Sequence, residues 1–203
     1  MADAPLYKQH RTNTRELHDV HLHGNHKLHV ICISKGKDVD KMLSTFRRKL
    51  GGMPVKLVGI DVEYTHYMKP QRAVVLQLCV EKNALSTTSL QLNRPMDLDK
   101  FLMNDEYTFV GFAIEGDKSK LKVSGLEINS DNYIDIQVEW RDPYNKKKFD
   151  SLANVAGRMI DIHYHDMKKK INHKEDHTLW GFCPLLEKFI KYALIDAFET
   201  YES

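Results

Sequence analysis

Residues 57–63, Leu-Val-Gly-Ile-Asp-Val-Glu, place two acids inside a run of apolar and β-branched residues. Such a run is typical of a β-strand, in which successive side chains point to opposite faces of the sheet. Asp61 and Glu63 therefore share one face, while Ile60 and Val62 point to the other. Two neighbouring carboxylates on a core strand repel each other and lose hydration, and a divalent cation relieves both costs. The alternative is a strand end that reaches solvent, where an acid pair needs no ligand.

The segments around this strand alternate in type. Strand patterns cover 57–63, 73–80, 86–92, 108–114 and 133–137, and helical patterns cover 97–103, 117–122, 151–159 and 185–201. Short connections between the first three strands favour antiparallel pairing. The order of strands and helices predicts an α/β fold, with a mixed sheet flanked by helices.

The first part of the chain predicts a hairpin followed by a helix. Residues 17–33 alternate in polarity around a Gly24-Asn25 turn, as two paired strands do. Residues 38–50 have apolar side chains at helical spacing, and Asp38 is suited to cap that helix.

Composition limits the kind of protein this is. The chain has 203 residues, of which 42% are hydrophobic and 29% charged, as expected for one globular domain. No apolar run approaches the roughly 20 residues that span a bilayer, and no secretory signal is expected from the N-terminal residues. The net charge of +2 argues against a polybasic coat but allows a local basic groove. No membrane partner is predicted.

The three cysteines have no pairing pattern. Cys32, Cys79 and Cys183 each lie among apolar neighbours, which favours buried, reduced thiols. Reduced thiols indicate the cytoplasm or the nucleus.

Two further acids lie at positions where burying a charge costs free energy. Asp117 follows the apolar strand 108–114, where a helix begins, and an ordinary N-cap is the alternative there. Asp196 lies four residues after Tyr192, at the edge of the apolar stripe of the last helix, so the two side chains are neighbours. A simple tyrosine–aspartate hydrogen bond is the alternative for that pair.

Taken in order, these motifs resemble the DEDD 3′–5′ exonuclease superfamily, and within it the Werner-syndrome-type exonuclease domain of the tyrosine subclass. The matching segments are Val58-Gly59-Ile60-Asp61-Val62-Glu63-Tyr64, Phe109-Val110-Gly111 with Ile114-Glu115-Gly116-Asp117 and Lys120-Leu121, and Tyr192-Ala193-Leu194-Ile195-Asp196. The family usually has Trp where this chain has Tyr64. The resemblance covers residues 55–201, and residues 1–54 resemble the N-terminal strand-and-helix extension of small plant members.

The resemblance implies a single exonuclease domain over 1–203, formed by that extension and the 55–201 core. The implied fold is ribonuclease-H-like, a five-stranded mixed sheet with helices on both sides. The implied catalytic residues are Asp61, Glu63, Asp117, Tyr192 and Asp196. The four acids would hold two divalent cations, Mg²⁺ or Mn²⁺, and the tyrosine would orient the attacking water. The implied products are nucleoside 5′-monophosphates, released from the 3′ end of single-stranded nucleic acid.

Substrate binding is expected at aromatic and basic residues near the motifs, because such side chains bind single strands. The candidates are Tyr64, His66, Tyr67, Lys69 and Trp180. Surface-loop positions are the alternative for the first four, and packing in the core is the alternative for Trp180.

Lysine and histidine clusters have competing interpretations. The runs 146–148 and 168–170 are either solvated surface or phosphate contacts. Histidines crowd the hairpin at positions 18, 21, 23, 26 and 29, where exposed positions compete with a zinc site.

The motifs leave RNA and DNA open, although the small single-domain chain favours RNA. The similar plant exoribonucleases assemble as rings, which predicts a homo-oligomer. The alternatives are a non-catalytic or weakly active binding module that keeps the fold, and a structural subunit of a larger assembly.

Overall fold

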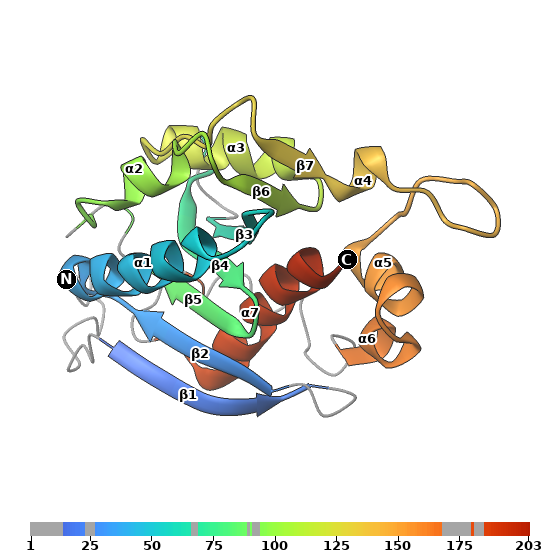
Figure 1. Ribbon diagram of the computed structural model, residues 1–203, viewed down its shortest axis with the longest axis horizontal. Coiled ribbons are helices and arrows are strands. Elements are labelled where there is room, and N and C mark those ends of the chain that lie inside the picture. The colour runs from blue at the N-terminus through green and yellow to red at the C-terminus, as the bar shows by residue number, and fades with distance from the viewer. Residues whose placement is uncertain are drawn as a thin grey trace, which may run out of the picture.

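The computed structural model of the chain describes residues 14–22, 27–65, 69–88, 90, 94–167, 180 and 185–203. Its centre is a seven-stranded mixed sheet with the strand order β1-β2-β5-β4-β3-β6-β7 (Figure 1). The strands are β1 (Thr14–His21), β2 (Lys27–Ile33), β3 (Leu57–Tyr64), β4 (Ala73–Val80), β5 (Asn83–Thr87), β6 (Thr108–Gly111) and β7 (Tyr133–Asp135). The helices are α1 (Gly36–Gly51), α2 (Leu98–Leu102), α3 (Ile114–Val123), α4 (Ile136–Glu139), α5 (Leu152–Met159), α6 (Ile162–Met167) and α7 (Glu187–Glu202).

The pairing of the strands confirms the predicted mixed sheet. Strand β4 is antiparallel to both β3 and β5, and β6 is parallel to both β3 and β7. Strands β3, β6 and β7 therefore end at the same edge of the sheet. Asp61 and Glu63 lie near that end of β3, and Asp117 follows β6.

The sheet has two strands more than the five that were predicted. Strands β3 to β7 form the expected core sheet, and the N-terminal hairpin joins the same sheet through β2, which runs parallel to β5. This pairing satisfies the backbone N–H and C=O groups that β5 would otherwise expose at the sheet edge. The extension is thus part of the sheet.

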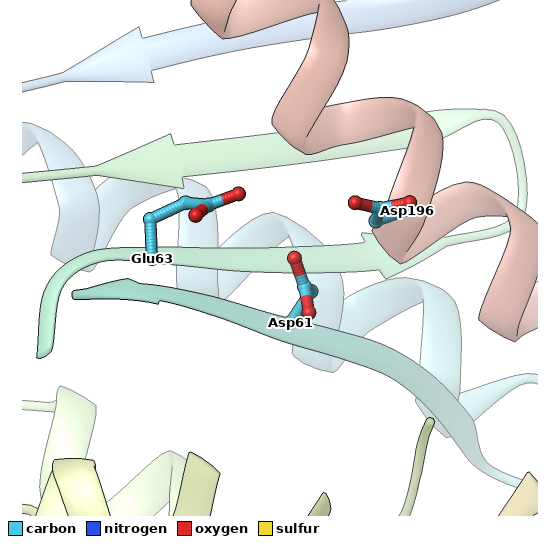
Figure 2. A group of neighbouring side chains, drawn as sticks. All are labelled: Asp61, Glu63 and Asp196. Carbon is cyan, nitrogen blue, oxygen red and sulfur yellow. The ribbon is translucent and has the colours of Figure 1, made fainter. Parts of the chain in front are cut away.

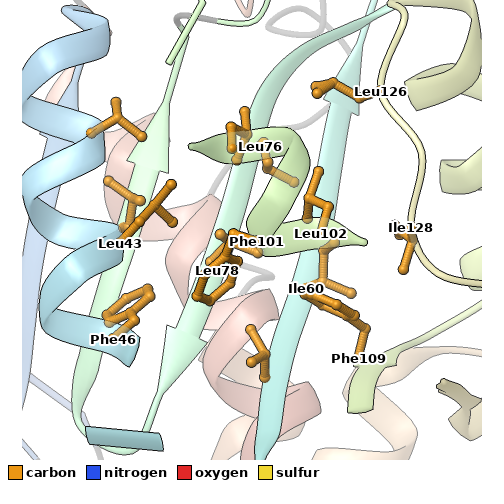
Figure 3. Packing of buried hydrophobic residues seen from close by; sticks show 14 of the residues in the cluster. Leu43, Phe46, Ile60, Leu76, Leu78, Phe101, Leu102, Phe109, Leu126 and Ile128 are labelled. Atoms are coloured by element: carbon orange, nitrogen blue, oxygen red, sulfur yellow. The ribbon is translucent and has the colours of Figure 1, made fainter. Parts of the chain in front are cut away.

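Helices cover both faces of the sheet. The apolar side chains of α1 and α2 pack with Ile60, Leu76 and Leu78 in one cluster, drawn in Figure 3. Helix α7 packs against β3, β4 and β5 on the opposite face. Because side chains alternate along a strand, Asp61 and Glu63 point to the α7 face while Ile60 points to the α1 face.

Several local predictions differ from the structure. The strand predicted at 133–137 ends at Asp135, because helix α4 begins at Ile136. The third strand of the core is Asn83–Thr87 instead of 86–92, because the turn before it takes only two residues, with Glu81 at φ 52°. Strand β6 ends at Gly111 because Ala113 adopts a left-handed conformation, and α3 begins at Ile114. Asp117 therefore lies inside the first turn of α3, not at an N-cap. Helix α1 begins after Lys35, so Asp38 lies in its first turn.

The described residues contain no helix that is both long and apolar enough to cross a membrane. The side chains of Cys32 and Cys79 are buried, as predicted. Cys183 lies outside the described residues.

Candidate functional site

Three of the predicted acids converge in space. Asp61 and Glu63 come from β3 and Asp196 comes from α7, and a carboxylate oxygen of each lies within 4.8 Å of the others. Figure 2 shows the three carboxylates turned toward one another, with Asp61 between the other two. Residues 133 positions apart in sequence are thus brought to one site, as the motif set predicts.

The close approach of α7 to β3 depends on Gly59. A Cβ atom at this position would lie 2.2 Å from the backbone oxygen of Ala197 and 2.9 Å from Cβ of Tyr201. The absence of a side chain lets the helix backbone rest directly on the strand. Gly59 and Asp61 face α7 together, so this contact sets how near Asp196 comes to Asp61.

The acid cluster suits a hard divalent cation. Glu63 and Asp196 are buried, with 8% and 7% of their surfaces exposed, and Asp61 is half-buried. Three carboxylates at this distance repel one another, and burial weakens the screening by water. Oxygen ligands of this kind, without nitrogen or sulfur, match the preference of Mg²⁺ and Mn²⁺.

Asp117 lies beside this cluster, on α3. The residue is 8% exposed, and burial first, then the negative charge of Asp61, raise the pKa of its carboxyl group from 3.8 to about 7. The group of three converging acids does not include it. The charge of Asp61 therefore acts on Asp117, which lies on α3 beside the site.

Lys120 connects Asp117 to Tyr64. Its Nζ atom lies 3.3 Å from Oδ1 of Asp117 and 3.9 Å from the centre of the Tyr64 ring. The ammonium group opposes the rise in the pKa of Asp117. The sequence predicts no role for Lys120, although its i,i+3 spacing from Asp117 is a signal for such a pair.

Asp135 is a further buried acid that sequence reasoning missed. It ends β7 and is 7% exposed, and its Oδ1 accepts hydrogen bonds from the backbone N–H groups of Ala113 and Gln137, both at 3.0 Å. The first bond holds the left-handed residue that precedes α3. Asp135 therefore fixes the turn that carries Asp117, and a cap position before α4 was its only signal in the sequence.

Tyr192 lies one turn before Asp196 on α7. Burial first, then the charges of Glu63 and Asp61, raise the pKa of its phenol far above the ordinary value of 10. The hydroxyl therefore keeps its proton at neutral pH and can donate a hydrogen bond beside the acids.

The predicted substrate residues have different surroundings. Trp180 is buried at 3% exposure and packs edge-on against Phe189, with ring centres 4.9 Å apart, which favours the packing alternative. Tyr64 contacts Lys120, and Lys69 is exposed. His66 and Tyr67 lie outside the described residues.

The other clusters are described only in part. Lysines 146–148 are exposed, while 168–170 lie outside the described residues. Of the hairpin histidines, His21 is exposed and His29 half-buried; positions 23 and 26 lie outside, as does the side chain of His18. The zinc alternative therefore falls mostly outside the described residues.

No protein-family model and no curated protein matches this chain. Solved structures share its fold. The Nibbler EXO domain of Aedes aegypti has a TM-score of 0.61 at 20% identity, covering 92% of this chain and 88% of that one. The catalytic core of RRP6 from Trypanosoma brucei has a TM-score of 0.64 at 16% identity, covering 92% and 48%.

A third similar structure is that of Escherichia coli RNase D, described as an exoribonuclease involved in structured RNA processing. Its TM-score is 0.56 at 18% identity, covering 83% of this chain and 41% of that one. This chain thus spans less than half the length of the RRP6 core and of RNase D. These likenesses establish the fold, a ribonuclease-H-like α/β domain.

Proposed function

We propose that this chain is a metal-dependent 3′–5′ exonuclease of the tyrosine subclass, of the Werner type, that degrades single-stranded nucleic acid. The observation that carries the proposal is the convergence of Asp61, Glu63 and Asp196 within 4.8 Å. Its support is the fold, which the chain shares with exonuclease domains. Membership of the tyrosine subclass rests on the position of Tyr192, one turn before Asp196.

The acids would hold two divalent cations, Mg²⁺ or Mn²⁺. Asp61 would help to hold both, since its carboxylate lies near those of Glu63 and Asp196 and its charge reaches Asp117. Bound cations of this kind lower the pKa of the attacking water and neutralise charge that grows on the phosphate. The carboxylates that would hold these cations lie on the α7 face of the sheet.

Tyr192 orients the attacking water instead of deprotonating it. Its raised pKa keeps the phenol neutral, so its Oη donates to, or accepts from, a water beside the acids. Water attacks the last phosphorus, the bond to the 3′ oxygen of the preceding nucleotide breaks, and that oxygen takes up a proton. The product is a nucleoside 5′-monophosphate.

RNA is the favoured substrate. One neighbour with this fold is described as an exoribonuclease involved in structured RNA processing. The buried thiols of Cys32 and Cys79 fit a reducing compartment, the cytoplasm or the nucleus. The proposed homo-oligomer is tested by light scattering on the purified chain.

The proposed activity is tested by a time course on RNA and DNA oligonucleotides of one sequence, labelled at the 5′ end. With Mg²⁺ or Mn²⁺, we expect a ladder of labelled products that shorten by one nucleotide at a time, faster for RNA. Excess EDTA should stop the reaction. Intact strands with both metals would contradict the proposal, and intact strands that still bind the protein would favour the binding module.

The affinity of the site for metal should depend on pH, because it depends on the ionisation of Asp117. A cation binds the ionised carboxylate, and Asp117 has a pKa of about 7 without metal. The apparent affinity for Mn²⁺ should therefore fall as the pH drops below 7, by up to about tenfold per pH unit. Calorimetric titration at pH 6, 7 and 8 measures this, and Asp117→Asn should flatten the dependence.

The same shift predicts the stability of the metal-free protein. The folded pKa of Asp117 is raised above its ordinary value of 3.8, so the folded state binds the proton more tightly. Its contribution to stability is fully present below pH 3.8 and is lost as the pH rises through 7. A metal-free melting temperature that does not respond to Asp117→Asn across pH 5–8 would contradict this account.

A further inference from the structure

The segment between α4 and α5 concentrates positive charge. From Arg141 to Arg158 the sequence has five cations and two acids, a net charge of +3. The whole chain has a net charge of +2, so all other residues together sum to −1. A polyanion that approaches this part of the chain therefore meets a local positive field.

Hydrogen bonds within the loop 141–149 give it a defined shape. The buried carboxylate of Asp142 accepts from the backbone N–H groups of Tyr144 at 2.8 Å and Asn145 at 3.1 Å. The N–H of Asp142 donates to the carbonyl of Lys147, and the N–H of Lys146 donates to the carbonyl of Asp142, both at 2.9 Å. Phe149 anchors the end of the loop in an apolar cluster.

The loop exposes an aromatic ring together with cations. Tyr144 is 80% exposed, and the guanidinium of Arg158 lies 5.1 Å from its ring centre. Arg158 is itself paired with Asp142, at 3.6 Å, so both partners of the ring contact are held by the same acid. The side chains of lysines 146–148, two to four residues after Tyr144 in the same loop, are exposed.

The loop lies toward the edge of the sheet that carries the acids. Strands β3, β6 and β7 are parallel and end at that edge, and α4 and then the loop directly follow β7. Figure 1 shows the loop extending outward from α4, beyond the ends of β6 and β7. A strand whose 3′ end reaches Asp61 has its upstream nucleotides available to contacts on this side of the molecule.

We propose that the loop 141–149 binds the single strand upstream of the 3′ end that the active site receives. Tyr144 offers a face for base stacking, and Lys146, Lys147 and Lys148 neutralise phosphates. This inference rests on the proposed exonuclease function. It assigns substrate binding to residues distant in sequence from the Tyr64–Lys69 group and from Trp180.

The inference is tested by binding of a fluorescent 12-nucleotide RNA in EDTA, where nothing is cleaved. The variant with Lys146→Ala, Lys147→Ala and Lys148→Ala should lose affinity at least about tenfold at low salt. Its plot of log affinity against log salt should be shallower by about 2, since single strands contribute about 0.7 per phosphate contact. Tyr144→Ala should weaken binding about tenfold, and Tyr144→Phe should bind as wild type does.

A matched control removes three lysines elsewhere. Lys41, Lys100 and Lys122 are 79%, 79% and 77% exposed and lie on α1, α2 and α3. Their triple alanine variant removes the same charge. We expect the decrease in the logarithm of its affinity for RNA to be less than about a third of the decrease in the loop variant. Equal losses in the two triple variants would overturn the inference, because net charge alone would then explain the binding.

A small substrate separates this inference from the proposed function. The p-nitrophenyl ester of thymidine 5′-monophosphate occupies only the active site, so all loop variants should hydrolyse it at the wild-type rate. If wild type cleaves this ester and the loop variants bind RNA as wild type does, the loop inference is wrong. If the ester and RNA both stay intact while the loop variants lose RNA binding, the proposed activity is wrong, and of the inference only the binding of RNA by the loop stands. Displacement of bound RNA by an equal concentration of a poly-glutamate peptide would instead identify an acidic protein as the partner and overturn the inference.

Discussion

Asp61→Asn should lower the rate of strand shortening by on the order of a thousandfold, since metal-bound charge contributes several kcal/mol to such reactions. Asparagine keeps the shape of the side chain but loses the negative charge. Asp61 is the acid whose carboxylate lies between Glu63 and Asp196 and whose charge raises the pKa of Asp117. No other described acid has both relations. Single-turnover cleavage at saturating Mg²⁺ measures the effect.

The fold should survive this substitution. Removing one charge relieves repulsion among buried carboxylates, so the metal-free variant should melt at or above the wild-type temperature. The pKa of Asp117 should then fall toward its ordinary value, because Asp61 no longer opposes its ionisation. Asp105→Asn, at an exposed position, is the matched control and should keep the wild-type rate. More than a tenth of the wild-type rate in Asp61→Asn would remove Asp61 from the mechanism.

Among substitutions that add one methyl group at this site, Gly59→Ala should destabilise the fold most. The added Cβ would lie 2.2 Å from the carbonyl oxygen of Ala197, 2.9 Å from Cβ of Tyr201 and 3.1 Å from Oγ1 of Thr200. The first of these atoms is helix backbone, so α7 as a whole has to move. Overpacking of this kind costs about 3 kcal/mol, and a chain of this length loses roughly 2–4 °C per kcal/mol. We expect the melting temperature to fall by about 6–12 °C.

Activity should fall with it. Helix α7 carries Tyr192 and Asp196, so any displacement of the helix moves both away from the acids of β3. Gly51→Ala is the control, because a Cβ atom there meets nothing within 4 Å, and alanine is the better helix former. That variant should keep its activity and melt no lower than wild type. A Gly59→Ala protein that melts within about 2 °C of wild type would show that the α7–β3 contact is looser than described.

Local periodicity predicts much of this fold correctly. The apolar positions Val39, Met42, Leu43, Phe46 and Leu50 follow helical spacing, and all five are buried in α1. Alternation along β3 places Ile60 and Asp61 on opposite faces, as observed. These features depend on neighbours in sequence, which is why the sequence alone reveals them.

The joining of distant segments is what periodicity misses. The parallel pairing of β2 with β5 brings His29 opposite Asn83, and neither segment marks its partner. This pairing turns a predicted extension into part of the central sheet. The early end of β6 has a similar cause, since Ala113 takes its left-handed conformation where its N–H meets the carboxylate of Asp135.

The site itself was predictable to the extent that it follows from the order of motifs. Asp61, Glu63 and Asp196 are brought together, and Asp117 lies near enough to Asp61 for their charges to interact. The contact of Lys120 with Tyr64 and that of Asp135 with Ala113 were not predictable, because each depends on how α3 is set against the ends of β3 and β7. For Trp180, burial against Phe189 favours the packing alternative, since an aromatic residue near a motif is as well suited to the core as to a substrate.

Manganese anomalous scattering from crystals of the chain tests the central claim most directly. Data collected at the Mn absorption edge, on crystals soaked in MnCl₂, should show two peaks among the carboxylates of Asp61, Glu63, Asp117 and Asp196. Crystals of Asp61→Asn should lose at least one of the two peaks. Wild-type crystals with no peak at these carboxylates, or with manganese bound only elsewhere, would contradict the account.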